Sequence, residues 1–92
     1  MITELERNRL IRQAVLEYLA TRNRMAFEAP LILRAVTRSR LLDFEPTREE
    51  VESALAFLLS SGWVTSIPSK FGKGTFYQAT AAGVLAFENS EI

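Results

Sequence analysis

Cysteine and histidine are both missing from this 92-residue sequence. Their absence excludes disulfide bonds, thiol nucleophiles, thiolate metal sites and imidazole acid–base chemistry. Only one aspartate is present, and no spacing of glutamate, serine or lysine residues suggests a catalytic pocket. We therefore expect a protein that is not an enzyme and that requires no metal ion and no cofactor.

Long apolar runs are also missing, since none approaches the roughly 20 residues that a membrane-spanning helix requires. The first part of the chain mixes glutamate with arginine, which is unlike a secretory signal peptide. We therefore expect a cytoplasmic protein with no membrane partner.

An excess of positive charge, which is usual in DNA-binding domains, is lacking as well. Eleven basic side chains balance eleven acidic ones, so the formal net charge is zero. Neutralising phosphates supplies most of the affinity for DNA, and any positive field must therefore be local. Hydrophobic residues make up 48% of the chain and charged residues 24%, as in ordinary folded proteins. We expect one domain that spans residues 1–92.

The stretch from Pro46 to Val64 predicts one amphipathic helix that ends at a glycine and leads into a strand. Thr47 and Glu50 have the spacing of a capping box, which marks the start of the helix. Gly62 stands where a residue in the left-handed conformation would end it. The apolar face of this helix is predicted to consist of Val51, Ala54, Leu55, Leu58 and Leu59.

An N-terminal helix is predicted within residues 1–22, from about residue 4 to residue 21. Thr3 and Glu6 form a second capping box at its start. Its arginines and glutamates alternate at short spacings, so we expect a solvated face held by ion pairs within the helix. Leu10 projects away from the apolar stripe, where it is either a lone exposed leucine without a role or a homodimer contact through the N-terminal helix.

A short strand and a second helix are expected between these two helices. Residues 25–27 predict the strand, and Pro30 suits the first turn of a helix that runs to about Arg40. The side chains expected to be buried here are Leu31, Ile32, Ala35 and Val36 of the helix, with Leu41 and Leu42 closing the core.

Residues 63–80 predict a β-hairpin, because aromatic and β-branched residues lie on both sides of a turn that contains glycines. Pro68 cannot donate a ladder hydrogen bond, so we expect it at a sheet edge or a bulge. Thr80 predicts the cap of a short terminal helix over residues 81–88. The side chains of this helix expected to pack on the N-terminal helix are Val84, Leu85 and Phe87.

The order helix, short strand, helix, helix, hairpin and helix resembles the winged helix-turn-helix superfamily, which includes the MarR-like and PadR-like bacterial regulators. Residues 47–64 resemble the third helix of that superfamily and its exit into the wing. Residues 77–83 resemble its strand that ends in a threonine with a glycine three residues later. The resemblance implies an α+β winged helix with a three-helix core, a short strand, a C-terminal hairpin wing and a short terminal helix.

The same resemblance implies a function, since the third helix would enter the major groove of double-stranded DNA and the wing would lie over the backbone. We therefore expect a non-catalytic DNA-binding domain of a transcriptional regulator. The candidate DNA contacts are Arg34, Arg38 and Arg40 of the second helix, Arg48 and Ser53 of the third, and Lys70, Phe71 and Lys73 at the wing tip.

Each of these clusters also has a structural interpretation. The arginines of the second helix could pair with neighbouring acidic side chains, and lysines at a hairpin tip commonly serve solubility. Glu49 and Glu52 point outward from the third helix, where they would repel phosphates. Phe57 either packs sideways against the hairpin or lines a protein interface. The alternative function is a winged helix that serves as a protein–protein interaction or assembly module without DNA binding.

Overall fold

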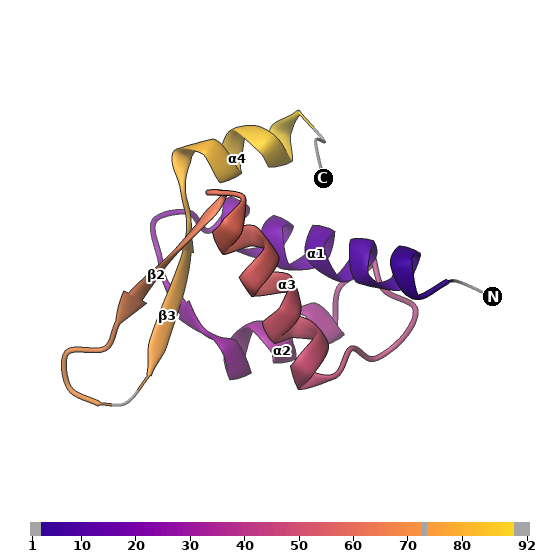
Figure 1. Ribbon diagram of the computed structural model, residues 1–92, viewed down its shortest axis with the longest axis horizontal. Helices are drawn as coiled ribbons and strands as arrows, with labels where there is room; N and C mark the ends of the chain where they lie inside the picture. Colours follow the sequence, from indigo (N-terminus) through magenta and orange to yellow (C-terminus); the bar gives the residue numbers. More distant parts are fainter. Residues whose placement is uncertain (1–2, 73, 90–92) are drawn as a thin grey trace.

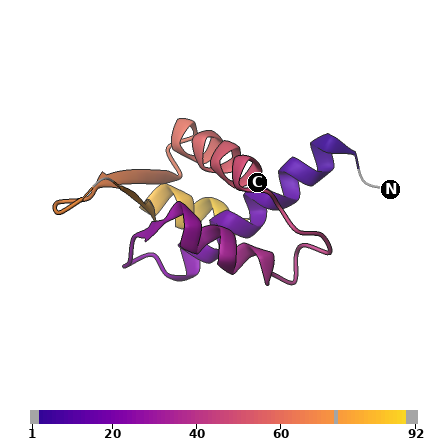
Figure 2. The ribbon, with the colours of Figure 1, turned by 90° about the horizontal axis from the view of Figure 1, so that it is seen from below.

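The computed structural model describes residues 3–72 and 74–89, and in these ranges four helices pack with a three-stranded antiparallel sheet (Figure 1). In chain order the elements are α1 (Glu4–Thr21), β1 (Phe27–Glu28), α2 (Ala29–Thr37), α3 (Arg48–Ser60), β2 (Val64–Pro68), β3 (Thr75–Ala79) and α4 (Ala81–Glu88). The β2–β3 hairpin projects from the helices as a wing in both views of the ribbon (Figures 1 and 2). The fold is the predicted α+β winged helix.

Threonine side chains cap the start of three helices. Thr3, Thr47 and Thr80 each accept a hydrogen bond from the backbone N–H three residues later. At Thr47 the capping box is complete, because the carboxylate of Glu50 accepts from the Thr47 N–H at 2.8 Å. Gly62 adopts a φ of 78°, which lets the chain leave α3 and enter β2. These local signals explain why the predicted helix starts are confirmed.

The sheet places β3 between its two partner strands, in the order β1-β3-β2. Pro68 lies opposite Thr75 at the far end of the edge strand β2, so its missing N–H disrupts no central ladder. Phe27 of β1 lies opposite Tyr77 of β3. The short strand occupies Phe27–Glu28 rather than residues 25–27, because its pairing with β3 determines its extent.

A continuous cluster of buried side chains joins α1, α2, α3 and the sheet. The prediction for α3 holds, because four residues of its apolar face are buried and Leu59 packs half-buried against them. The largest fully buried side chains are Ile11, Val15, Leu16, Leu19, Ile32, Val36, Val51, Leu55 and Leu58.

The buried side of α2 differs from the prediction. Ile32 and Val36, four residues apart, are buried as expected, but Leu31 is 43% exposed. Leu33 packs against the core instead of Leu31, because α2 faces the core with the side that carries Leu33. Leu41 is also exposed, so Leu42 alone closes the core at this point.

Helix α2 ends at Thr37, about three residues before the predicted end at Arg40. The N–H groups of Arg38 and Ser39 donate to carbonyls three residues back, which is the spacing of a tighter 3₁₀ turn and not of an α-helix.

The start of α4 is fixed against the start of β2 by very close backbone contact. The Thr80 N–H donates to the Trp63 carbonyl at 3.0 Å, and the Thr80 hydroxyl donates to the Gly62 carbonyl at 2.7 Å. Gly83 lies directly over the Trp63 carbonyl, and a Cβ on Gly83 would overlap that oxygen. Only a residue without a side chain fits there.

The side of α4 that faces the core differs from the prediction in one residue. Val84 and Phe87 pack against the buried cluster, and Ala86 is itself buried. Leu85 is 57% exposed, so the expectation that it lies on α1 is wrong. Leu85 and Phe87 are two residues apart and therefore lie about 160° apart around a helix of 3.6 residues per turn, so Leu85 falls on the outer side.

The arginines of α1 do not form the predicted ion pairs within the helix. Arg7 reaches across to α3, where its guanidinium donates to both carboxylate oxygens of Glu50. It also donates to the Glu45 carbonyl at 3.1 Å and lies 4.1 Å from the centre of the Phe44 ring. Among residues 3–72 and 74–89 the only other ion pair is that of Arg48 with Glu52. Arg7 therefore ties α1 to the loop that precedes α3.

Phe57 also has a different neighbour from the one predicted. Its ring is 45% exposed, and the guanidinium of Arg12 lies over it at 4.2 Å from the ring centre. The side chain is thus covered by α1 rather than by the hairpin. Sequence spacing along either helix cannot indicate this contact, because it joins residues 45 positions apart.

The ion pair at the start of α3 predicts a defined dependence of stability on pH. The hydrogen bond from Arg7, assisted by those from Thr47, lowers the pKa of Glu50 from 4.5 to about 2. The contribution to folding free energy is complete above pH 4.5 and is lost as the pH falls towards 2. In urea unfolding, Glu50→Gln should reduce stability at pH 7, and the difference from the native protein should shrink between pH 5 and pH 2.

Glutamine can still accept the capping hydrogen bond, so this variant removes the charge and leaves the cap. Glu49→Gln is the matched control, because Glu49 is exposed in the same helical turn and forms no ion pair among the described residues. A stability difference for Glu50→Gln that stays constant across this pH range would contradict the assignment.

Candidate nucleic-acid interface

Two arginines predicted to bind DNA lie together on the exposed side of α2. Arg34 and Arg38 are exposed, four residues apart, and Leu31 shares their side of the helix. Within the described ranges neither guanidinium forms a hydrogen bond or an ion pair, so pairing with Glu28, Asp43 or Glu45 does not occur. Both side chains are therefore available to an external anion such as a phosphate.

Arg40 does not share this position. It lies on the turn after α2 and lines a pocket whose opposite wall is α1. The three arginines lie within seven residues of the sequence but face two different parts of the surface.

The tip of the wing presents an exposed basic and apolar surface. Phe71 is 99% exposed, which excludes the interpretation that its ring folds down onto the strands. Lys70 beside it is exposed and forms no ion pair in the described part of the chain. Ile67 of β2 adds a partly exposed apolar side chain. The predicted third residue of this cluster, Lys73, lies outside the described residues.

A crevice of about 390 Å³ separates the wing from the helices. Arg48, the first residue of α3, lines it together with Glu52, and the two side chains pair at 3.2 Å. Glu28 of β1 contributes a second carboxylate to the same crevice. Glu28 cannot be predicted as a residue of this crevice from the sequence, since nothing local indicates that β1 would bring it beside the wing.

Ser53 lies on another flank of α3 from Arg48. It lines a smaller groove of about 140 Å³ between α3 and α1, together with Arg12 and Phe57. The Nε of Arg12 is buried and has no hydrogen-bond partner in the described residues. The two α3 candidates are therefore divided between an acidic crevice and a groove that contains an arginine.

The described residues contain no group of three or more acidic, histidine or cysteine side chains that could hold a metal ion. None of the helices in residues 3–72 and 74–89 combines the length and the apolar character that crossing a bilayer requires.

Comparison with known proteins identifies a similar fold for this chain but no family. No protein-family model matches the chain, and no curated protein matches it. Among solved structures, the fold is similar to that of a transcriptional regulator from Clostridium thermocellum, with a TM-score of 0.76 and 16% sequence identity. The match covers 98% of this chain and 84% of the other. At this identity the similarity concerns the fold alone.

Proposed function

We propose that this protein is a winged-helix domain that binds double-stranded DNA without catalysis and acts in transcriptional regulation. The observation that carries the proposal is the pair of uncompensated arginines on α2, together with a basic wing tip, on a fold that a transcriptional regulator shares over 98% of this chain. The assignment to MarR-like or PadR-like regulators stays a prediction.

The expected contacts follow from the positions of the free cations. Arg34, Arg38 and Lys70 would neutralise phosphates, and Phe71 at the wing tip would lie against sugars or enter a minor groove. Arg48 would have to exchange its partner Glu52 for a base or a phosphate. Affinity should therefore come from the backbone and depend steeply on salt.

Fluorescence anisotropy with a labelled 30-base-pair duplex of mixed sequence tests the proposal. We expect binding in the micromolar range at about 50 mM salt, and weaker binding as the salt concentration rises. No binding at tens of micromolar protein would refute DNA binding, because even non-specific binders register under these conditions.

The exposed position of Lys70 at the wing tip leads to a separate prediction. Lys70→Ala should weaken binding to every duplex to a similar degree and reduce the salt slope by about one unit, since one phosphate contact is lost. Arg9→Ala on α1 removes the same charge from an exposed position outside the proposed interface and serves as the control. Equal effects of both variants would indicate that only net charge matters, and the wing would lose its assigned role.

The crevice between the wing and α3 favours a second candidate function, a protein-interaction module. Glu28 and Glu52 place two carboxylates in that crevice against the single guanidinium of Arg48. Such a surface repels phosphates and suits a basic or mixed protein surface. If the anisotropy experiment shows no DNA binding, this function becomes the better explanation.

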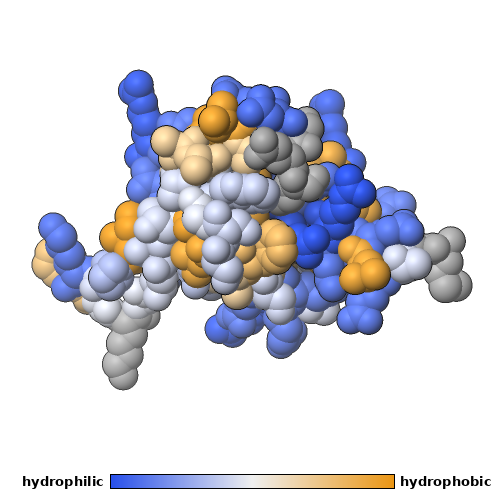
Figure 3. Space-filling model, turned by 45° about the horizontal axis from the view of Figure 1, so that its top comes forward, coloured by the Kyte–Doolittle hydropathy of each residue, from blue (hydrophilic) through white to orange (hydrophobic). Residues whose placement is uncertain are grey.

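A homodimer through α1 is the remaining part of the proposal. Leu10, on which the sequence prediction rested, packs half-buried against the core, whereas Leu5 of the same helix is 81% exposed. The face that carries α4 shows separate orange patches among pale and blue residues (Figure 3), and Leu85 is exposed on that helix. Sedimentation equilibrium of the native chain and Leu5→Gln measures whether α1 supports self-association.

A further inference from the structure

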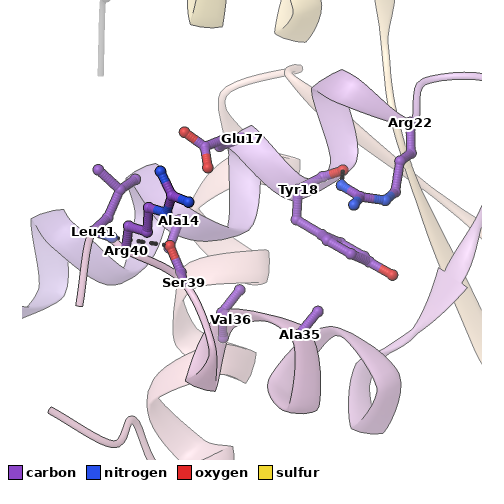
Figure 4. A pocket seen from close by; sticks show the side chains of 9 residues that line it. All are labelled: Ala14, Glu17, Tyr18, Arg22, Ala35, Val36, Ser39, Arg40 and Leu41. Carbon is purple, nitrogen blue, oxygen red and sulfur yellow. Dashed lines mark hydrogen bonds between the residues drawn. The ribbon is translucent and has the colours of Figure 1, made fainter. Parts of the chain in front are cut away.

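A pocket of about 350 Å³ lies between α1 and the C-terminal end of α2 (Figure 4). This volume is within the range of small-molecule sites, at its lower end. The DNA contacts proposed above use neither Glu17 nor Tyr18, which line its α1 side. Its wall is made of Ala14, Glu17, Tyr18, Arg22, Ala35, Val36, Ser39, Arg40 and Leu41.

Two charged side chains of opposite sign line this pocket without a partner. Glu17 comes from α1 and Arg40 from the turn after α2, and Figure 4 shows both at the same end of the pocket. In the described part of the chain neither side chain forms a hydrogen bond or an ion pair, with each other or with any other residue. An acceptor and a planar donor fork are thus both available to a ligand.

The other arginine of the pocket is already engaged. Arg22 lies over the Tyr18 ring at 4.4 Å from its centre and donates to the Tyr18 carbonyl at 3.4 Å and the Thr21 hydroxyl at 3.1 Å. These contacts hold the aromatic ring as a wall of the pocket. Arg40 is therefore the guanidinium that can accept a new anionic partner.

The rest of the wall suits a short apolar group next to a positive charge. Ala14 and Val36 are buried beneath the pocket, and half-buried Ala35 presents a small apolar surface that leaves the space a larger residue would fill. The C-terminal end of α2 directs its negative dipole end towards this region, which favours an ammonium group. The Ser39 hydroxyl accepts from the Leu41 N–H at 3.1 Å and retains its own proton for donation.

We propose that this pocket binds a small zwitterion that carries both an ammonium and a carboxylate group, namely a free amino acid or a dipeptide. The ammonium group binds the Glu17 carboxylate, and the ligand carboxylate binds the Arg40 guanidinium. The apolar side chain of the ligand rests on Ala35 beside the Tyr18 ring. A ligand with only one of the two charges leaves one protein charge unpaired in the pocket.

Titration of the isotopically labelled full chain followed by NMR tests this proposal in the absence of DNA. The probes are the twenty L-amino acids and the dipeptide Ala-Ala, each to about 10 mM, which detects dissociation constants in the millimolar range. We expect at least one probe to shift the backbone signals of Ala14, Tyr18 and Ser39. Its N-acetyl and its amide derivatives should each bind about tenfold more weakly, because each lacks one charge.

Two variants test which protein side chain binds which charge of the ligand. Glu17→Gln should weaken binding of the zwitterion about tenfold or more and leave binding of the N-acetyl derivative, which lacks the ammonium group, unchanged. Arg40→Gln should weaken binding of the zwitterion to a similar degree and leave binding of the amide derivative, which lacks the carboxylate, unchanged. Arg9→Gln and Glu88→Gln are charge-matched controls at exposed positions outside the pocket. Absence of shifts with every probe, or native affinity in both pocket variants, would overturn the proposal. Neither outcome depends on whether the protein binds DNA.

Discussion

Gly83→Ala is expected to destabilise the protein by about 2–4 kcal/mol, although alanine is the better helix former. The added Cβ would overlap the Trp63 carbonyl oxygen and lie 2.8 Å from its carbon. The obstacle is backbone, so it cannot turn aside as a flexible side chain would. Relief requires α4 to move away from β2, which would break the hydrogen bond from Thr80 to Trp63. Urea or thermal unfolding monitored by circular dichroism measures the loss.

Gly72→Ala is the matched control for this variant. A Cβ at Gly72 would approach only the Ser69 hydroxyl oxygen, at an ordinary contact distance of 3.9 Å. Its effect should stay within about 0.5 kcal/mol, as for most surface substitutions. If Gly83→Ala were neutral or stabilising, as helix propensity alone predicts, the close contact between α4 and β2 would be disproved.

The double variant Arg34→Gln with Arg38→Gln is expected to cause the largest loss of DNA affinity. Both guanidinium groups are exposed and free of internal partners in the described residues, so their removal costs no ion pair within the protein. Two lost phosphate contacts should flatten the salt slope by about 1.8 and weaken binding at least about tenfold at low salt. Anisotropy titrations between 50 and 200 mM salt measure both quantities.

Arg9→Gln combined with Arg24→Gln removes the same net charge from exposed positions on α1 and the turn before β1. This control should retain most of the affinity. An unchanged salt slope in the α2 variant would exclude α2 from the interface, even if the protein binds DNA through other residues.

Local signals in the sequence account for most of the element boundaries. Each threonine cap fixes a helix start through a hydrogen bond to an N–H group three residues away, so the necessary information lies within one turn. Gly62 marks the end of α3 for a similar reason, because few other residues adopt its φ of 78°. The short strand was misplaced because β1 exists only by pairing with a strand about fifty residues later.

The candidate site was less predictable than the fold. The sequence identified exposed cations correctly at Arg34, Arg38 and Lys70, since basic residues off an apolar stripe generally face water. It could not indicate that Arg40 would turn towards α1 or that Glu28 of β1 would come beside Arg48 and Glu52 in the crevice. Those outcomes depend on how two elements approach each other, which sequence periodicity does not specify.

Periodicity, caps and turn glycines alone determined where this chain forms helices and a hairpin, because each of these signals acts within a few neighbouring residues. The arrangement of these elements as a winged helix was implied by the resemblance to that superfamily. The tertiary structure alone decided which leucines stay exposed, why residue 83 must lack a side chain, and that Arg7 would connect α1 to the start of α3. These features arise where segments far apart in the sequence meet, and the packing of the whole core fixes their distances.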